Sequence, residues 1–478
     1  MPHETVIGLE IHVQLKTASK MFCGCRVAFA APPNTLVCPV CLGLPGALPV
    51  VNERAVELAV RAAVALGCTV HPRSAFARKN YFYPDLPKGY QITQYDRPLA
   101  TDGSLDAPAE GGGAPPVRIR RLHVEEDSGK SLHDRFPETT AIDLNRAGVP
   151  LVEIVTEPDL HSPAHARAFL VRLKQTLEYL EVSDCNMEEG SLRVDANVSV
   201  RRPGSHELAT KTEVKNMNSF SQLSKALAFE ASRQVDLLEG GGAVEHETML
   251  WDPVRGATRP MRGKEEAHDY RYFPEPDLPT LVLPEALIDT VTDGLPELPW
   301  EKIRRFVQTY GLREYDAGVL SADRRLAAFF EATAEATPDP KTAANWVMGE
   351  MLAISNELGQ HVAELGIEPV ELGRLIDRVE TGALSHTLGK QVLRRMIETG
   401  KPADAVIDEE GLSLVSDSDQ IDEWVGEAIR ENPAEVERYR DGEEKLLAFF
   451  IGQVMRKSRG KADPERVRDR LARALATD

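Results

Sequence analysis

The sequence predicts an α+β protein, because two kinds of hydrophobic periodicity divide it. Before residue 294, strict apolar/polar alternation, typical of half-buried strands, is mixed with helical segments. From Trp300 onward, helical periodicity dominates, as in Trp300, Ile303 and Phe306, and strand alternation nearly disappears. A second change of character lies at 399–406, "TGKPADAV". We therefore expect a mixed α/β domain over 1–294, an all-α domain over 295–405 and a small helical tail domain over 406–478.

The first strand is the clearest element. In "VIGLEIHVQL" one face carries apolar side chains and the other carries polar ones, because side chains alternate along a strand. The apolar face consists of Ile7, Leu9, Ile11, Val13 and Leu15, and the opposite face of Gly8, Glu10, His12 and Gln14. Glu10 and His12 thus point the same way. A lone histidine is more often structural than functional, but its position beside Glu10 on a polar face weakens that interpretation.

The next elements follow from local signals. "NERAVELAVRAAVALG" predicts a helix that stops at Gly67, and Ser162 with Pro163 suits the start of a helix that has an apolar stripe. The stretch 100–116, rich in Gly and Pro, predicts an exposed loop between two strands. "GSLRVDANVSV" and "ATKTEVKNMNSF" alternate again, and the second sets Lys211, Glu213 and Lys215 on one face. A helix follows from about Ser221 to the glycines at 240–242. Such polar faces are either solvated sheet or one shared site.

Charge and composition limit the function. The chain of 478 residues has a net charge of −19, which argues against a surface that coats nucleic acid throughout. No apolar run reaches membrane-spanning length and the N-terminus lacks a signal pattern, so we expect a cytoplasmic protein with no membrane contact. The last 34 residues, from Lys445, nevertheless carry nine Lys/Arg against four Asp/Glu, a net of +5. Their cluster Arg456, Lys457, Arg459 and Lys461 fits a phosphate backbone, or simply the dipole of a helix end.

Four cysteines predict a structural zinc site at 22–42. Cys23 and Cys25 form C-x-C, and Cys38 and Cys41 form C-x-x-C. This spacing resembles a zinc knuckle, and four thiolates saturate the ion, leaving no position for water or substrate. Cys68 and Cys185 have no comparable partner and are expected to be core thiols.

The stretch "HVEEDSGKS", residues 123–131, ends like a phosphate-binding P-loop but is not one. A P-loop needs glycine where Val124 stands, so that successive N–H groups can wrap the phosphates. The adjacent acids Glu125, Glu126 and Asp127 would repel a polyphosphate unless a divalent cation lay between them. The stretch is therefore either a magnesium site that handles ATP through metal or a solvated acidic turn.

Other groups complete a candidate site. The acids Glu153 and Glu157 in "LVEIVTEPD" could also hold metal, and basic residues could take phosphate oxygens, namely Lys79, Lys88, Arg146 and Arg193. There is no Ser-Lys or Cys-His nucleophile arrangement in the sequence, so covalent acyl chemistry is not indicated.

Taken together, these stretches resemble the B subunits of the aminoacyl-tRNA amidotransferases, the GatB/GatE family. The matching segments run in order from residue 4 to about 464: "ETVIGLEIHVQL", "RKNYFYPDLPKGYQITQYD", "RLHVEEDSGKS", "DLNRAGVPLVEIVTEPD", "MEEGSLRVDANVS", "EVKNMNSF", "DYRYFPEPDLP" and "FFIGQVMRKSRGKADP". The resemblance implies a glutamine-synthetase-like cradle domain, then a helical domain, then a tail that contacts tRNA.

The resemblance also implies a reaction carried out by a heterotrimer. ATP phosphorylates the side-chain carboxylate of Glu-tRNA(Gln) or Asp-tRNA(Asn), and ammonia displaces the phosphate; the ammonia comes from an amidase (glutaminase) partner, which a small linker protein joins to this chain. Magnesium would then be held by His12, Glu125 and Glu153, ATP would be contacted by Lys79, Arg146 and Arg193, and Glu10 or Glu126 would take a proton from ammonium or gate its entry. Two alternatives remain: a non-catalytic tRNA-binding adaptor, and a small-molecule carboxylate–amine ligase.

Overall fold

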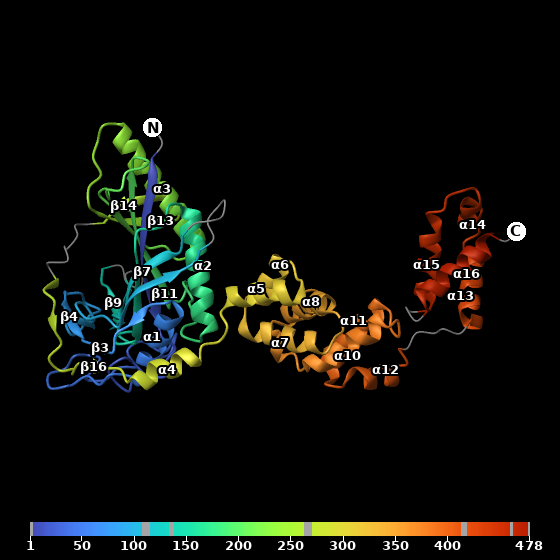
Figure 1. Cartoon of the computed structure of the whole chain (residues 1–478), viewed down its shortest axis with the longest axis horizontal. Helices are drawn as coiled ribbons and strands as arrows, with labels where there is room; N and C mark the ends of the chain where they lie inside the picture. The colour runs from blue at the N-terminus through green and yellow to red at the C-terminus, as the bar shows by residue number, and fades with distance from the viewer. Residues whose placement is uncertain are drawn as a thin grey trace. The chain divides into compact units, whose positions relative to one another are not determined.

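Strand β1 (Glu4–Gln14) lies at the centre of a nine-stranded sheet in the computed structural model (Figure 1), which describes residues 3–107, 115–132, 138–261, 270–412, 418–458 and 462–476. The sheet order is β14-β13-β12-β11-β1-β10-β7-β6-β2. The other strands of this sheet are β2 (Thr69–Val70), β6 (Ala100–Leu105), β7 (Val117–Glu126), β10 (Pro150–Thr156), β11 (Leu192–Arg201), β12 (Thr212–Lys215), β13 (Thr248–Asp252) and β14 (Ala257–Pro260). Neighbouring strands are antiparallel except β12 and β13.

Smaller sheets and several helices surround the large sheet. The small sheets contain β3 (Arg73–Ser74), β4 (Ala77–Asn80), β5 (Tyr90–Thr93), β8 (Lys130–Leu132), β9 (Ala141–Asp143), β15 (Phe273–Pro274) and β16 (Leu281–Val282). The helices are α1 (Glu53–Ala65), α2 (Pro163–Tyr179), α3 (Phe220–Glu239) and α4 (Glu285–Asp293). Helix α3 packs on α2 and β11, while α1 packs near β7 and β6. The mixture of sheet and helices, with an all-helical C-terminal region, confirms the α+β class.

The core face of the sheet is the apolar face expected from β1. Ile7, Leu9, Ile11 and Val13 are fully buried, while Glu10 and His12 are partly exposed on the opposite face. The alternation in β11 is confirmed in the same way, with Leu192, Val194, Ala196, Val198 and Val200 buried. One face of the sheet therefore forms the hydrophobic core, and the other presents polar groups from several adjacent strands.

The predicted helix starts are also confirmed. Ser162 caps α2 by accepting a hydrogen bond from the backbone N–H of His165, and Asn52 caps α1 through Ala55. Helix α3 ends at Gly240, before the other two glycines of the expected stop.

Two local expectations were wrong. Residues 100–105 form strand β6 instead of a loop, because pairing with β7 supplies the backbone partners that local propensity did not predict. Residues 108–114 of the same stretch lie outside the described residues. Lys211 precedes β12, so only Glu213 and Lys215 share its polar face.

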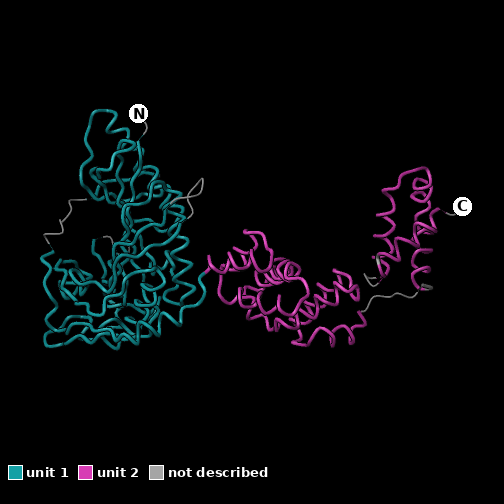
Figure 2. The backbone as a smooth tube through the Cα atoms, in the orientation of Figure 1, with its two compact units in different colours: residues 1–298 teal, residues 299–478 magenta. Residues whose placement is uncertain are grey.

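The described residues divide into two compact units, 1–298 and 299–478 (Figure 2). The second unit contains α5 (Pro299–Tyr310), α6 (Glu314–Leu320), α7 (Arg324–Glu335), α8 (Pro340–Trp346), the π-helix η2 (Val347–Met351), α9 (Leu352–Leu358), the short 3₁₀ helix η3 (Val362–Glu364), α10 (Pro369–Glu380), α11 (His386–Thr399), α12 (Ala403–Glu410), α13 (Ser418–Glu431), α14 (Pro433–Arg440), α15 (Leu446–Lys457) and α16 (Pro464–Ala476). Of the helices in the described ranges, none combines the length and the apolar character needed to cross a bilayer.

Among the described residues of the second unit, two separate hydrophobic clusters hold the helices. One runs from Phe306 to Leu412 and the other from Ile421 to Leu475. Helix α12, which spans the domain limit expected at 405, packs in the first cluster through Ala403 and Val406. The domain limits at 294 and 405 remain predictions about independently folding parts.

Candidate active site and metal centres

The polar face of the sheet gathers a cluster of acids and histidines from three strands. His12 on β1 lies opposite Glu153 on β10, and Glu153 in turn lies opposite His123 on β7. Glu125 follows two residues after His123, so its side chain has the same orientation. The antiparallel register alone therefore places these four side chains next to one another.

The distances within this cluster are short enough for shared coordination. One imidazole nitrogen of His12 lies 3.7 Å from a carboxylate oxygen of Glu125 and 3.4 Å from one of Glu153. The ligand atoms of His12, Glu125 and Glu153 all lie within 4.8 Å of one another. His123, which is buried, lies 3.7 Å from the carboxylate of Glu125 and 3.4 Å from that of Glu153. The hydroxyl of Thr93 donates to Glu125 at 3.0 Å.

In this buried cluster, the negative charges of the glutamates and the positive charges of the histidines stabilise one another. Burial by itself would lower the pKa of His12, but contact with Glu153 and the charge of Glu125 raise that pKa to about 9. Burial would raise the pKa of Glu153, yet His123 and His12 hold it well below its usual range. Burial would likewise raise the pKa of Glu125, and His123 with His12 lowers it. Both carboxyl groups are therefore ionised at neutral pH, which is the form that binds a cation.

The three residues His12, Glu125 and Glu153 fit a divalent cation. Two carboxylate groups beside an imidazole match the way magnesium is held together with phosphate oxygens, and an imidazole nitrogen also suits manganese. His123 is absent from the residues predicted from the sequence. Its position two residues before Glu125 on an alternating strand is a signal that could have identified it.

The other predicted acids lie elsewhere. Glu126 is on the opposite side of β7 from Glu125; it forms an ion pair with Lys88 and accepts the backbone N–H of Ile92 at 3.0 Å. It lines a cavity of about 220 Å³ beside the cysteine segment. Asp127 pairs with Arg193 at 2.9 Å and with Arg146 at 3.5 Å. The structure thus brings only one of the three adjacent acids into the cluster.

Glu10 and Glu157 have partners of their own. Glu10 shares the polar face with His12 and accepts a hydrogen bond from the amide of Asn197 at 2.9 Å. Glu157, just after the end of β10, forms a two-point ion pair with Arg120 on β7, with both contacts at 2.9 Å. Glu10 remains a candidate for proton transfer, whereas Glu157 has no place in the cluster.

The predicted phosphate-binding residues lie around the acids. Arg193 lies opposite His12 in the sheet register, and Arg146 donates to the backbone carbonyl groups of Ser128 and Gly129 at 3.0 Å and 2.7 Å. The ammonium group of Lys79 lies 4.8 Å from the ring centre of Tyr270. Burial would lower the pKa of Lys79, but Tyr272, Glu125 and Glu153 raise it, which places a permanent positive charge near the cluster.

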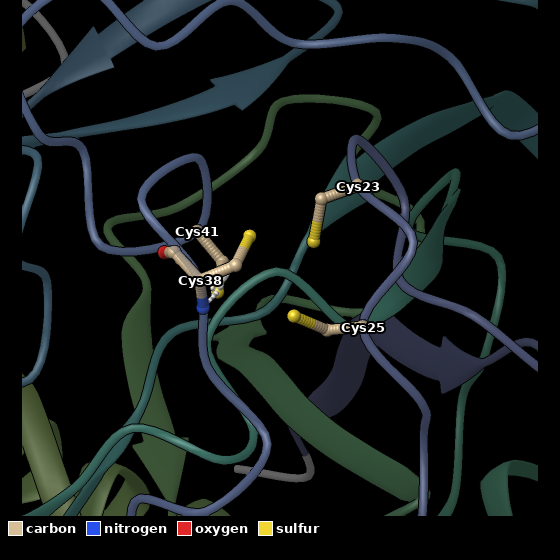
Figure 3. A group of neighbouring side chains, drawn as sticks. All are labelled: Cys23, Cys25, Cys38 and Cys41. Carbon is tan, nitrogen blue, oxygen red and sulfur yellow. Dashed lines mark hydrogen bonds between the residues drawn. The ribbon is translucent and has the colours of Figure 1, made fainter.

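The four cysteines of the predicted zinc site converge (Figure 3). The sulfur atoms of Cys23, Cys25, Cys38 and Cys41 lie within 4.8 Å of one another, as a tetrahedral ion requires. Cys41 accepts the backbone N–H of Cys38 at 3.1 Å, and hydrogen bonding from the Cys23 thiol lowers the pKa of Cys41 to about 4. Cys41 is thus a thiolate at neutral pH, the form that binds metal.

A lysine without exposed surface lies beside this centre. Lys20 is 0% exposed, and its ammonium group lies 3.6 Å from the sulfur of Cys41 and 3.5 Å from the carbonyl oxygen of Leu144. A buried cation next to the Cys41 thiolate reduces the net negative charge of the centre. No periodic pattern surrounds Lys20 in the sequence, so this role had no local signal.

The predicted tRNA-binding residues are only partly described. Lys457 at the end of α15 is paired with Glu427 at 3.1 Å and with Glu431 at 2.7 Å, both on α13. Arg456 is exposed and contacts the side chain of Gln453. Arg459 and Lys461 lie outside the described residues.

Fold and site together define a class: a mixed α/β domain with a His/Glu group on its sheet and a group of four cysteines, each of which could hold a metal ion, followed by helical regions. Residues 5–289 match the model of the GatB/GatE catalytic domain, and residues 328–475 match that of the GatB domain. The chain belongs to the GatB/GatE family.

Curated relatives cover the chain from end to end. The B subunit of the aspartyl/glutamyl-tRNA(Asn/Gln) amidotransferase from Thermodesulfovibrio yellowstonii is 50% identical over 475 residues, covering 99% of this chain and all of the relative. The protein of the same name from Chlorobium limicola is also 50% identical over 475 residues, with the same coverage. That of Caldicellulosiruptor bescii is 48% identical over 478 residues, covering 99% of each chain. The resemblance inferred from the short motifs is confirmed.

Proposed function

We propose that this chain is the B subunit of an aminoacyl-tRNA amidotransferase, which converts Glu-tRNA(Gln), Asp-tRNA(Asn) or both to the amide forms. The observation that carries the proposal is the convergence of His12, Glu125 and Glu153 from three strands. The chain is also 50% identical in sequence to a curated subunit of that name. The heterotrimer would act in the cytoplasm, with an amidase (glutaminase) partner and a small linker protein as its other components.

The chemistry needs an activated carboxylate. An ionised side-chain carboxylate does not accept ammonia, so its oxygen must first become a leaving group, and transfer of the terminal phosphoryl group of ATP makes an acyl phosphate. Ammonia then attacks the carbonyl carbon, the bond from carbon to the phosphate oxygen breaks, and the amide and inorganic phosphate remain. Phosphoryl transfer depends chiefly on positioning and on neutralisation of charge.

The residues of the site have separate tasks in this reaction. His12, Glu125 and Glu153 would hold the cation, and His123 contacts both carboxylates. A bound magnesium ion would neutralise charge on the phosphates of ATP. Arg193, Arg146 and Lys79 offer positive charge to phosphate oxygens from the surrounding elements.

Proton transfer is assigned to Glu10. The attacking species must be neutral ammonia, so a carboxylate has to accept the extra proton of ammonium. Glu10 lies on the polar face two residues from His12, where the amide of Asn197 donates a hydrogen bond to its carboxylate. Glu126, which faces Lys88 and the cavity beside the cysteines, suits the passage of ammonia better than direct contact with the phosphate.

The cysteine centre has a structural task. Four thiolates would complete a tetrahedral zinc site, and the segment that carries the cysteines supplies Phe22, Cys23 and Cys41 to the wall of the 220 Å³ cavity. Zinc would therefore fix the loop that forms one wall of the cavity that Glu126 also lines.

Reconstitution tests the proposal. The chain is assembled with the glutaminase and linker proteins, and each misacylated tRNA is incubated with ATP, magnesium and glutamine. We expect Gln-tRNA or Asn-tRNA to form only when ATP, magnesium and glutamine are all present. An adaptor without catalysis would support no hydrolysis of ATP that depends on misacylated tRNA, and a small-molecule ligase would keep its full rate after deletion of 406–478; either result would refute the proposal.

A further inference from the structure

A row of five tyrosines lies next to the acidic cluster. Tyr95 stacks on Tyr272, with ring centres 4.0 Å apart and planes inclined by only 6°. Tyr272 meets Tyr270 edge to face at 6.1 Å, Tyr270 meets Tyr81 at 5.9 Å, and Tyr81 meets Tyr83 at 6.1 Å. These contacts join three segments of the chain, so a continuous row runs from Tyr83 to Tyr95. We call it the tyrosine row.

Hydrogen bonds tie this row to the strand that carries Glu125. The hydroxyl of Tyr81 donates to Gln91 at 3.3 Å, and the amide of Gln91 donates to the backbone carbonyl of Glu126 at 2.7 Å. Thr93 on β5 donates directly to Glu125, and Tyr95 follows it by two residues. Two residues span about 7 Å at most. The row therefore lies close to the proposed metal ligands.

The electrostatic environment agrees with this placement. Burial raises the pKa of Tyr272; Lys79 lowers it, and the carboxylates of Glu153 and Glu125 raise it further. Burial and then Glu125 raise the pKa of Tyr81. Both rings thus feel the charges of the acidic cluster while their phenols stay neutral at physiological pH.

The two ends of the row face water, while Tyr81, Tyr270 and Tyr272 between them are half-buried. Tyr95 is 41% exposed and Tyr83 is 55% exposed, and the neighbouring Phe82 is 78% exposed. Exposed aromatic rings at both ends of one row, with Phe82 beside Tyr83, are uncommon on a surface with no binding role. Aromatic side chains at such places serve as platforms for unpaired bases, because every base has a flat π face that can stack.

We propose that the tyrosine row, with Phe82, stacks the unpaired bases at the 3′ end of the misacylated tRNA. This inference rests on the proposed function. The amino acid is esterified to the terminal nucleotide, so placing its side-chain carboxylate at His12 and Glu125 brings the terminal base within one nucleotide of the row. The tRNA end offers several consecutive unpaired bases to the exposed rings of Tyr83, Phe82 and Tyr95, whereas ATP offers only one base.

The ammonium group of Lys79 adds positive charge to this surface. It lies over the rings of Tyr270 and Tyr81, at 4.8 Å and 5.9 Å from their centres. Because Lys79 is also assigned to the phosphate oxygens of ATP, its position beside the rings places the row next to the site of phosphoryl transfer. The row would thereby orient the ester as well as bind the bases.

Kinetics of the assembled complex test the assignment. Tyr95→Ala is expected to raise KM for the misacylated tRNA about 5- to 100-fold, with KM for ATP unchanged, because base–aromatic stacking has this magnitude. Tyr95→Phe keeps the ring, so its KM for the misacylated tRNA should stay close to that of the original chain. Tyr83→Ala should show a smaller rise of the same kind. Tyr315→Ala in the second unit, where Tyr315 is 77% exposed, is the matched control with no effect.

A binding measurement keeps the inference testable without catalysis. A tRNA with 2-aminopurine in place of the terminal adenosine should lose fluorescence when the complex binds it, and Tyr95→Ala should abolish most of that loss. Unchanged quenching and unchanged KM in Tyr95→Ala, or a rise in KM for ATP alone, would overturn the inference. A complex that forms no amide with the original sequence would instead refute the proposed function, while the fluorescence result would still report on stacking.

Discussion

His12 and Glu153 face each other across the antiparallel pair of β1 and β10, with 3.4 Å between the imidazole nitrogen and the carboxylate oxygen. Because directly opposite side chains of a sheet have their Cβ atoms about 5 Å apart, the register fixes this approach before any ligand is present. Glu153 meets His123 at the same distance on its other side. Its carboxylate is therefore the central group of the cluster, and its removal should have the largest effect.

Replacing Glu153 by glutamine tests that expectation. Glu153→Gln keeps the shape of the side chain but removes one of the two negative charges that hold the cation. We expect amide formation to fall by about 100-fold or more, because metal-assisted charge stabilisation is worth several kcal/mol. The measurement is the single-turnover rate of the assembled complex at saturating tRNA, which separates chemistry from binding.

Glu157→Gln provides the control for this experiment. Glu157 lies four residues further along the chain and pairs with Arg120, whose side chain is 61% exposed. Exposed ion pairs contribute about 0–1 kcal/mol. The control should therefore retain its rate, and equal losses in both variants would contradict the special role of Glu153.

Cation affinity should depend on pH. The pKa of His12 is raised to about 9, so the imidazole is protonated at pH 7 and must lose a proton before it can bind metal. Affinity for manganese or magnesium should then rise from about pH 6.5 to about pH 8.5, by about tenfold per pH unit for each proton displaced. Calorimetry in two buffers with different ionisation enthalpies would report the released proton. An affinity that does not change with pH would contradict the cation site at His12.

The sequence predicts which side chains of one strand share a face, but not which strands lie next to one another. Alternation along β1 is a local property, so Glu10 and His12 could be placed together without knowledge of the fold. That Glu153 meets His123 depends on the order of the strands, which long-range pairing decides. Alternation also means that Glu125 and Glu126 cannot share a face, although the two were predicted together.

Contacts between distant segments had no signal in the sequence at all. Tyr95 stacks on Tyr272, and Lys20 is buried against Cys41, because the intervening chain folds back on itself. The cysteines were different, since the spacing of C-x-C and C-x-x-C reflects the geometry that four ligands of one ion require.

Zinc removal should affect folding of one segment. Cys38→Ser removes one of four thiolates, so the purified chain should lose its zinc, expected at about one equivalent. Structural zinc contributes roughly 10–16 kcal/mol of apparent binding energy in small peptides, so the loop that carries the ligands should open. Metal analysis and limited proteolysis of residues 22–49 would show this. Cys68→Ser, at a cysteine outside the cluster, should leave both unchanged.

Lys20 should strengthen the same centre. Its buried ammonium group lies 3.6 Å from the sulfur of Cys41, so Lys20→Met removes a charge that offsets the negative thiolates while largely keeping the volume of the side chain. Zinc affinity should fall by about 10- to 100-fold, as is typical when a partner of a metal ligand is lost. Competition with a chromogenic chelator would measure it. Lys16→Met, at an exposed lysine just after β1, is the control, and equal affinities in the two variants would contradict the role of Lys20.

Binding of tRNA should distinguish two neighbouring basic residues of α15. Lys457 is already paired with Glu427 and Glu431, so a phosphate would have to compete with two carboxylates for its ammonium group. Arg456 is exposed, and its guanidinium group donates to the neutral side chain of Gln453. Arg456→Gln should therefore lower tRNA affinity more than Lys457→Gln does, and it should reduce the slope of log affinity against log salt by about 1, as expected for one lost phosphate contact. Filter binding at several salt concentrations would measure both slopes, and identical slopes in the original chain and in Arg456→Gln would exclude a phosphate contact at that residue.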